Sequence, residues 1–400
     1  MENPKIRFKG FTKDWEQRKL GDIYGSIGNA FVGTATPYYA EHGHFYLESN
    51  NVKDGQINHN AEIFINDEFY EKQKDKWLHT GDMVMVQSGH VGHAAVIPEE
   101  LDNTAAHALI MFRNPKEEIE PYFLNYEYQT DKAKKQIENI TTGNTIKHIL
   151  ASDMQEFVVD IPKYEEQKVI ASYFCNLDNL ITLHQRKCEQ TKNLKKYMLQ
   201  KMFPQNGAKV PEIRFNGFTH DWEQRKLGEV FKEYSEKNHT ELPALTIIQG
   251  GGTVKREDSD RNLMYDESNL SNYKMVRKDD FIVHLRSFEG GLEKSALDGI
   301  VSPAYHTFHS DVADSRFYYP YFRSHEFIKH KLVPHVYGIR DGRSIDIDGM
   351  KIIEIPYTSM EEQRQIGDYL ESLDHLITLH QRQCDELKKM KKYMLQNMFI

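Results

Sequence analysis

Several short motifs place histidines or paired acidic residues at spacings that chemistry could use. The segments His90–His93 and His306–His309 each carry two histidines three residues apart, a spacing that could bind a metal ion. No cysteine or carboxylate cluster accompanies them at ligand spacing, so the pattern favours ordinary loop or strand histidines. The paired carboxylates Glu99–Glu100 and Asp279–Asp280 lie in polar stretches, where solvated carboxylates are the rule.

The motifs that define common enzyme sites are incomplete or missing. Gly28 to Thr34 has the glycine spacing of a phosphate-binding loop, but Thr34 occupies the position of the phosphate-contacting lysine. The sequence has no G-x-G-x-x-G, H-E-x-x-H or G-x-S-x-G motif, and no Asn/Asp-Pro-Pro-aromatic run of the kind that amino-methyltransferases use. We therefore expect a chain without catalytic, cofactor-binding or metal-binding residues of its own.

The composition is typical of a soluble globular protein. Of the 400 residues, 39% are hydrophobic and 28% are charged, which is enough for more than one hydrophobic core. No apolar run of about 18 residues predicts a membrane span, and the first residues lack the apolar segment of a secretory signal. Because the three cysteines favour reduced thiols, we expect a cytoplasmic protein with no membrane partner.

Three stretches of the sequence occur twice with few changes. The copies are 6–21 and 213–228, 177–186 and 373–382, and 195–203 and 391–399. The regions between these copies, 23–160 and 230–354, differ from each other in sequence. This internal duplication predicts two related halves with a pseudo-twofold relation, and a tandem arrangement without symmetry is the alternative.

Each half ends in a long segment with helical periodicity. The first runs from Glu165 to Lys201 between Pro162 and Pro204, and the second begins at Glu361. The stripe expected on the first helix is Ile170, Tyr173, Leu177, Leu180, His184, Cys188, Thr191, Leu194, Met198 and Met202. The matching stripe on the second is Ile366, Tyr369, Leu373, Leu376, His380, Cys384, Leu387, Met390 or Lys391, Met394 and Met398.

Two such stripes predict that the helices pair as an intramolecular coiled coil about 55 Å long. The histidines and cysteines on the stripes stand four residues apart, as metal ligands on a helix can, but packing is the favoured interpretation.

The two variable regions share one order of elements, with strands followed by a helix and a last strand. In the first region we expect strands at 44–48, 83–87, 94–97, 108–113 and 157–161, and a helix from Pro121 to about Glu138. In the second we expect strands at 245–249, 281–285, 304–309 and 351–355, and a helix from Pro320. The expected fold class is therefore α/β (α+β).

The net charge of −9 argues at first against binding to nucleic acid, but the charge is unevenly divided. Residues 23–160 contain 10 Lys and Arg against 21 Asp and Glu, and residues 230–354 contain 17 against 20. The repeated blocks are therefore net basic. The lysines of the long helices supply much of this excess, and for most of them a solvated helix face is the favoured interpretation.

In its repeated blocks the chain resembles the specificity (S) subunits of type I restriction-modification systems. The residues that carry the resemblance are Asp14–Asp22, Ile161–Ile170, Leu177–Ile181 and their second copies, together with the glycine-centred stretch Thr141–Ile146. The counterpart of that stretch, Tyr337–Arg340, matches less well. The resemblance covers essentially the whole chain, and two variable regions between duplicated helices form a specific signature.

The resemblance implies two target recognition domains joined by two long antiparallel helices. Each domain would read one half of a split double-stranded DNA target, while the helices set the spacer. The implied boundaries are 1–160 for the first conserved block and recognition domain, 161–204 for the first helix, 205–354 for the linker, second block and second domain, and 355–400 for the second helix. The implied partners are two methyltransferase (modification) subunits and restriction subunits, which would carry S-adenosylmethionine, ATP and Mg²⁺.

Base reading favours Arg, Asn, Gln and Lys on loops, with glycine allowing close approach of the backbone. In the first region the candidates are Asn50, Asn51, Lys53, Gln87, Ser88, His90, His93, Asn144, Thr145 and Lys147. In the second they are Gln249, Lys255, Arg256, Arg286, Ser287, Lys294, Arg340 and Arg343. The alternatives are a self-sufficient DNA-modifying enzyme and a coiled-coil protein-interaction scaffold that does not bind DNA.

Overall fold

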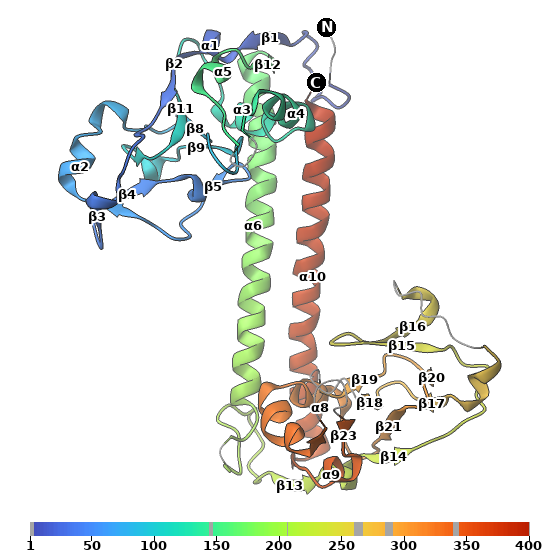
Figure 1. Cartoon of the computed structure of the whole chain (residues 1–400). Coiled ribbons are helices and arrows are strands. Elements are labelled where there is room, and N and C mark those ends of the chain that lie inside the picture. The colour runs from blue at the N-terminus through green and yellow to red at the C-terminus, as the bar shows by residue number, and fades with distance from the viewer. Residues whose placement is uncertain are drawn as a thin grey trace. The chain divides into compact units, whose positions relative to one another are not determined.

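The structure is a computed structural model that describes residues 4–143, 147–205, 207–259, 267–284, 291–338 and 344–399. It divides into two compact units (Figure 1). Unit 1 comprises Met1–His184 and Arg382–Ile400, and unit 2 comprises Gln185–Gln381. Each unit thus contains one repeated block, one variable region and part of each long helix.

Unit 1 is built around an antiparallel sheet in the order β2-β11-β8-β9. These strands are β2 Tyr24–Asn29, β11 Leu109–Pro115, β8 Met83–Val86 and β9 Ala94–Val96. All four residues of β8 are buried because the sheet is covered on both faces: Met83 and Met85 enter one core, while Val84 and Val86 enter another. The α1 turn (Leu20–Ile23) and α3 (Pro121–Glu127) contribute to the first of these cores.

Shorter elements complete unit 1. β1 Glu16–Lys19 pairs antiparallel with β12 Val158–Ile161, which closes the variable region against the repeated block. A small sheet in the order β10-β4-β7-β3 contains β10 Ala105–Ala106, β4 His44–Leu47, β7 Phe64–Ile65 and β3 Tyr39–Ala40. The unit also contains β5 Val52–Lys53, β6 Gln56–Ile57, α2 Asp67–Glu71, α4 Asp131–Ile140 and α5 Ala151–Gln155.

Unit 2 repeats this plan with the sheet order β14-β21-β18-β19. Its strands are β14 Lys232–Tyr234, β21 Tyr305–His309, β18 Phe281–His284 and β19 Glu293–Lys294. Phe281 and Val283 enter the main core of the unit and Ile282 enters a second core, so this sheet is also covered on both faces. The variable region also contains β15 Leu245–Ile248, β16 Gly252–Lys255, β17 Lys274–Val276, β20 Gly299–Val301, α8 Ser315–Phe322, β22 Val336–Tyr337, β23 Ser344–Ile345 and α9 Ile347–Lys351.

The same contacts attach the repeated block to the long helix in both units. In unit 1 the Arg7 guanidinium binds both carboxylate oxygens of Glu166 at 2.7 and 2.8 Å. In unit 2 Arg214 binds Glu362 in the same way at 2.6 and 2.9 Å, and β13 Glu223–Lys226 pairs with β24 Glu354–Tyr357 as β1 pairs with β12. These matched contacts confirm that the two halves are structural repeats.

The long helices are α6 Tyr164–Lys201 and α10 Met360–Met398, close to the predicted limits. In unit 1 Lys391 binds Asp178, and Phe399 packs against Phe174. In unit 2 Cys188 contacts Gln381, and Lys195 binds Asp374. Within each unit, later positions on one helix therefore meet earlier positions on the other, and the helices run antiparallel as predicted.

The predicted stripe needs correction at three positions. Leu180, Leu194 and Leu376 are 41–43% exposed, whereas Phe174, Ile181, Leu370 and Leu395 are buried. Of the two alternatives at one position, Met390 is 49% exposed and Lys391 is 14% exposed, so Lys391 belongs to the stripe. On α6 the buried residues Ile170, Phe174, Leu177 and Ile181 are separated by steps of four, three and four, and Cys188 follows seven residues later. The predicted stripe began with a step of three, which placed several leucines on the wrong face.

Three predicted elements of the variable regions also differ. The helix expected from Pro121 to Glu138 is two helices, α3 and α4, because Thr130 caps α4 by accepting a hydrogen bond from the Ala133 N–H. The helix expected from Pro320 begins at Ser315, where Asp314 caps it. The strand expected at 351–355 is β24, which begins at Glu354 because α9 extends to Lys351.

Candidate nucleic-acid interface

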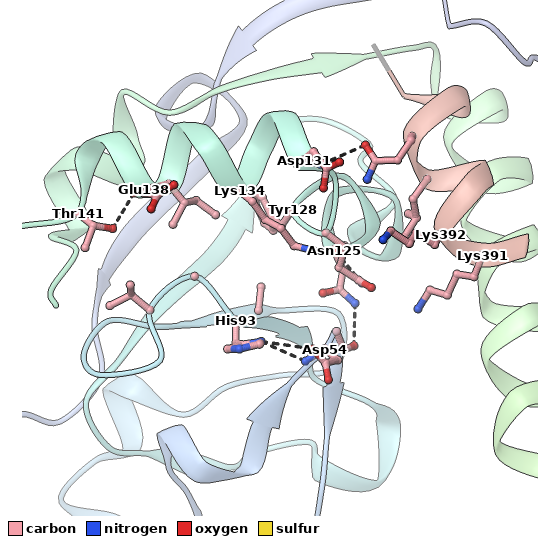
Figure 2. A pocket seen from close by; sticks show the side chains of 18 of the residues that line it. Asp54, His93, Asn125, Tyr128, Asp131, Lys134, Glu138, Thr141, Lys391 and Lys392 are labelled. Carbon is pink, nitrogen blue, oxygen red and sulfur yellow. Dashed lines mark hydrogen bonds and ion pairs between the residues drawn. The ribbon is translucent and has the colours of Figure 1, made fainter. Parts of the chain in front are cut away.

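Unit 1 contains a cleft of about 530 Å³ between the variable region and the C-terminal turns of α10 (Figure 2). One wall consists of the loops at 54–55 and 91–94, and another consists of α4. Five lysines line the cleft against three carboxylates, those of Asp54, Asp131 and Glu138. The lysines are Lys134, Lys147, Lys388, Lys391 and Lys392.

Two glycines allow the loops to pack closely on the helices. A Cβ atom at Gly92 would lie 2.8 Å from Cγ2 of Ile137 on α4, and the φ of Gly92 is +84°. At Gly55, whose φ is also +84°, a Cβ atom would lie 2.4 Å from Nε2 of Gln129. The carbonyl of Gly55 accepts a hydrogen bond from Nδ2 of Asn125 at 2.8 Å. Glycine is therefore required at both positions to form this wall of the cleft.

His93 is a polar group in the wall, and its burial disfavours the charged form. Burial lowers the pKa of His93, although the Asp54 carboxylate, 3.8 Å from Nδ1, acts in the opposite direction. The backbone N–H of Asp54 donates to Nδ1 of His93 at 3.2 Å. Nδ1 is then an acceptor, so the hydrogen of the neutral ring is on Nε2, where it can be donated to a ligand.

Lys391 differs from the other lysines of the cleft because its charge is neutralised inside the unit. Its ammonium group binds both oxygens of Asp178 at 2.7 and 2.8 Å, and the two side chains are 14% and 13% exposed. The Tyr126 hydroxyl donates to the same carboxylate at 2.8 Å. By contrast Lys134, Lys147, Lys388 and Lys392 are exposed, so their ammonium groups can meet an anionic ligand such as a phosphate backbone.

The structure brings together two of the loops that the sequence predicts for base reading. The Ser88 hydroxyl bonds to Nδ1 of His148 at 2.6 Å, and the Gly89 N–H donates to the Lys147 carbonyl at 3.0 Å. A further hydrogen bond links the same two loops: the backbone carbonyl of Gln87 accepts from the Ile149 N–H at 2.9 Å. His90 is exposed at the tip of its loop, and His93 and Lys147 line the cleft. Asn144 and Thr145 lie outside the described residues.

The third predicted loop, at 50–53, differs from the other two because one of its candidate residues is buried. Asn51 is 2% exposed, and its amide is used within the loop: Oδ1 accepts from the Glu48 N–H and Nδ2 donates to the Asn58 carbonyl, both at 3.1 Å. Asn51 thus stabilises the turn, and we do not include it among the groups that meet a ligand. Asn50 and Lys53, on either side of it, are exposed.

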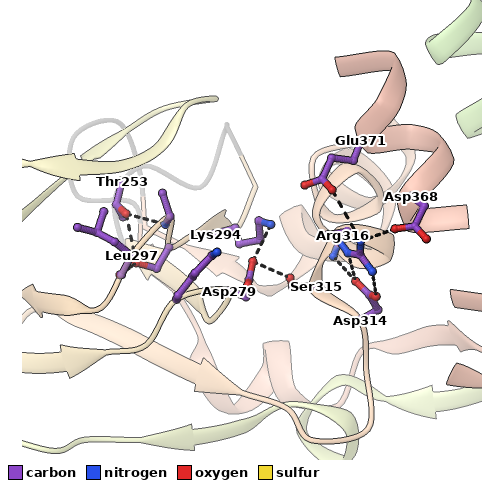
Figure 3. A network of polar contacts seen from close by, with 12 residues as sticks. Thr253, Asp279, Lys294, Leu297, Asp314, Ser315, Arg316, Asp368 and Glu371 are labelled. Carbon is purple, nitrogen blue, oxygen red and sulfur yellow. Dashed lines mark hydrogen bonds and ion pairs between the residues drawn. The ribbon is translucent and has the colours of Figure 1, made fainter. Parts of the chain in front are cut away.

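In unit 2 the four predicted residues that the structure describes lie in or beside the β15–β16 hairpin. Gln249 is exposed in its turn, and Lys255 is exposed at the end of β16. The Arg256 guanidinium lies 5.7 Å from the centre of the Tyr273 ring. Lys294 pairs with Asp279 at 2.8 Å beside the hairpin (Figure 3). Four predicted residues of this region, Arg286, Ser287, Arg340 and Arg343, lie outside the described residues.

Three lysines of the cleft are not among the residues predicted to contact DNA. The sequence favours a solvated helix face for Lys388 and Lys392, and Lys134 does not stand out in it. The C-terminal turns of α10 line the cleft although they are more than 200 residues away in sequence from the loops of the variable region that form its other walls. The repeat of 195–203 at 391–399 indicated a shared role for these turns, but not which loop they would meet.

The described residues contain neither of two other kinds of site. Each of their helices is too short or too polar to span a membrane. Among these same residues, no group of three or more His, Cys, Asp or Glu side chains could hold a metal ion.

Comparison with known proteins places these features in a family. The model of the type I restriction modification DNA specificity domain matches residues 12–193 and again 219–389. A putative type I restriction enzyme MjaX specificity subunit from Methanocaldococcus jannaschii is 25% identical, with 97% of this chain and 93% of the relative covered. The type I restriction enzyme MjaVIII specificity subunit of the same organism is 24% identical, with coverage of 95% and 91%.

A solved structure has the same fold. The S subunit of a type I restriction-modification system from M. genitalium has a TM-score of 0.63 and 14% sequence identity. The comparison covers 100% of this chain and 99% of that one.

Proposed function

Because the chain belongs to the family of type I restriction-modification specificity subunits and carries two DNA specificity domains, we propose that each unit reads one half of a split DNA target. The observation that carries this proposal is a repeated framework with divergent loops. Arg7–Glu166 and Arg214–Glu362 fix the repeated blocks, to which the variable regions are joined, to the long helices in the same way. Two equivalent supports for two different surfaces suit a protein that reads two different short sequences.

The residues that contact DNA fall into two groups in this proposal. The base-reading group comprises the predicted polar residues of the variable loops that the structure describes, without the buried Asn51, namely Asn50, Lys53, Gln87, Ser88, His90, His93, Lys147, Gln249, Lys255, Arg256 and Lys294. The phosphate-contacting group comprises Lys134, Lys388 and Lys392 in unit 1. Phosphate contacts position a protein on the duplex without reading its sequence. The acidic average of the chain is compatible with this role because lysines outnumber carboxylates in the lining of the cleft, five to three.

We propose that α6 and α10 set the spacer between the two halves of the target. Paired readers on one face of DNA are separated by about one helical turn, roughly 34–36 Å, or by a multiple of it. A helix of 38 residues, as in α6, is about 57 Å long and can span such a distance.

Both units also offer the same surface for a partner. Unit 1 exposes Leu180 and Leu183 on α6 together with Met390 and Tyr393 on α10. Unit 2 exposes the repeat counterparts, Leu376 and Leu379 on α10 together with Leu194 and Tyr197 on α6. Each pair is three residues apart and so lies on one helix face. We propose that each set, the helix-face patch of its unit, docks one modification subunit, which gives two per chain.

The chemistry belongs to the partners in this proposal. The modification subunits bind S-adenosylmethionine and methylate adenine, and the restriction subunits use ATP and Mg²⁺. This chain supplies recognition and assembly, in the cytoplasm, and no catalytic group.

Mapping of methylated adenines in a host that carries this chain and its modification partner tests the function. The expected result is a gapped motif with two specific halves and a spacer of fixed length. A continuous motif would contradict the proposal. Insertion of four residues, about 6 Å, at paired positions of α6 and α10 should then lengthen the spacer and leave both halves unchanged.

A further inference from the structure

The β15–β16 hairpin of unit 2 ends in a glycine-rich turn at Gln249–Gly252. The two strands pair antiparallel with Ile248 opposite Gly252, and the Gly251 N–H donates to the Ile248 carbonyl at 2.9 Å. Gln249 is exposed in this turn, and Ile248 beside it is 42% exposed. The turn therefore presents one amide and one apolar side chain to the outside of the unit.

The carboxylate of Glu293 binds the backbone of this turn. Its Oε1 accepts a hydrogen bond from the Gly250 N–H at 2.7 Å, and its Oε2 accepts one from the Gly252 N–H at 3.2 Å. The Tyr319 hydroxyl donates to Oε2 at 2.9 Å, and the Arg323 guanidinium pairs with Oε1. The Glu293 side chain is only 8% exposed, so these donors replace the water that a carboxylate would otherwise bind.

Both glycines are required for this contact. Gly250 and Gly252 have φ values of +82° and +71°, which other residues rarely adopt. A Cβ atom at Gly250 would lie 2.8 Å from Nη2 of Arg323, and one at Gly252 would lie 2.7 Å from the Lys294 carbonyl oxygen. The glycines thus allow the two backbone N–H groups to reach the carboxylate.

The groups around Glu293 belong to the framework of the unit. β19 pairs with β18 in the main sheet, where Glu293 lies opposite Ile282. Tyr319 is on α8, and Arg323 follows directly after that helix. Next to the turn, the Thr253 hydroxyl contacts the Ser295 hydroxyl at 3.2 Å and accepts from the Ala296 N–H at 2.9 Å (Figure 3). The turn is therefore fixed to the sheet and to α8.

We infer that Glu293 is a positioning residue for DNA reading, which fixes the turn so that the Gln249 amide meets a base edge in one half of the target. The inference rests on the proposed function and adds to it a residue that itself contacts no DNA. A fixed turn loses less conformational freedom on binding than a free loop, so the side chain that it carries discriminates better between bases. The amide of glutamine can both donate to and accept from a base edge, as base reading in the major groove requires.

Methylated-site mapping with complexes that contain Glu293→Gln or Gln249→Ala tests this inference. A glutamine at position 293 places an NH₂ group against N–H donors, which releases the turn. Both variants should increase methylation about tenfold at sites with a changed base at one shared position of one half. The other half should stay unchanged. The matched control is Glu233→Gln, which alters a carboxylate of the same unit that pairs with Lys351 and His306 away from the turn.

A wild-type methylation pattern for Glu293→Gln, beside a relaxed pattern for Gln249→Ala, would overturn the inference. Tyr319→Phe removes one donor and keeps the carboxylate, and it should relax the same position to a smaller degree. If Glu293→Gln abolished all methylation while Tyr319→Phe matched the wild type, Glu293 would only maintain the fold, and the inference would also fall. Failure of the proposed function itself is recognised separately, because an exchange of residues 230–354 would then leave both halves of the motif unchanged.

Discussion

The Asp178 carboxylate on α6 accepts two hydrogen bonds from the Lys391 ammonium group on α10, at 2.7 and 2.8 Å. The repeat counterparts Asp374 and Lys195 form the same pair in unit 2, at 2.7 and 2.6 Å. The surroundings of the two pairs differ. Asp178 is 13% exposed and accepts a further bond from Tyr126, whereas Asp374 is 52% exposed. Both copies thus form the contact between the helices. The contact is more buried in unit 1, where the variable region packs over it.

Asp178→Asn should destabilise the protein much more than Asp374→Asn does. Removal of one partner of a buried pair leaves an uncompensated charge, here that of Lys391, at a cost of about 3 kcal/mol. The exposed pair should contribute about 1 kcal/mol or less. Thermal unfolding of the two variants under identical conditions measures the difference, and each variant is the control for the other. Equal losses of stability would show that burial of the first pair has no energetic consequence.

Lys388→Ala and Lys392→Ala should each weaken the binding of DNA by the assembled complex. The effect should be similar for specific and unrelated sequences, and each variant should reduce the slope of log affinity against log salt by about 1, because one phosphate contact is lost. Lys389→Ala is the matched control, since Lys389 is exposed on the same helix and does not line the cleft. An unchanged salt slope in both test variants would exclude the cleft as a phosphate-contacting surface.

The free energy of unfolding should fall with increasing pH because of the buried carboxyl group of Glu127. Burial raises the pKa of this carboxyl to about 8, and its Oε1 accepts a hydrogen bond from the Asp160 N–H at 2.8 Å. Between the ordinary pKa of about 4.5 and pH 8 the folded chain retains a proton that the unfolded chain releases. The stabilisation is therefore complete below about pH 4.5 and is lost as the pH rises to about 8.

Glu127→Gln removes this dependence because the amide keeps an acceptor oxygen and does not ionise. The melting temperature of the variant should exceed that of the wild type by several degrees near pH 8.5 and approach it near pH 5. Glu100→Gln, at an exposed position, is the control and should leave the pH profile unchanged. A wild-type profile in Glu127→Gln would show that this carboxyl is ionised in the folded chain.

Leu180→Lys combined with Tyr393→Lys should remove one modification subunit from the complex. These substitutions place charge on the helix-face patch of unit 1, and the patch of unit 2 stays intact. Mass measurement of the assembled complex should therefore show one modification subunit instead of two. Val32→Lys, at an apolar position that is 61% exposed outside the helices, should leave the mass unchanged. Retention of both subunits in the double variant would place the docking surface elsewhere.

The sequence predicted the large elements well because their signals are local. Pro162 and Pro204 mark the limits of α6, and the repeated blocks identified α10 as its counterpart. The strand predicted at 83–87 is β8, Met83–Val86, and its unbroken apolar run matches a sheet covered on both faces. The break at Thr130 was missed because a single capping hydrogen bond decides it, and the helical pattern continues on both sides.

The candidate site was predicted only in part, because most of it depends on distant packing. The loops at 87–93 and 147 were singled out by residue type, but nothing in the sequence showed that Ser88 and His148 join them. Lys388 and Lys392 lie among several similar lysines, and only the fold distinguishes them. Glu293 is an ordinary acidic residue in the sequence, and its role depends on the two glycine N–H groups that meet it in the folded unit.

The most direct test of the account replaces residues 23–160 with the variable region of another specificity subunit and maps the methylated sites. The account predicts that one half of the motif changes to that of the donor, while the other half and the spacer length stay as they were. A change in both halves, or in neither, would contradict the claim that each unit reads its own part of the target.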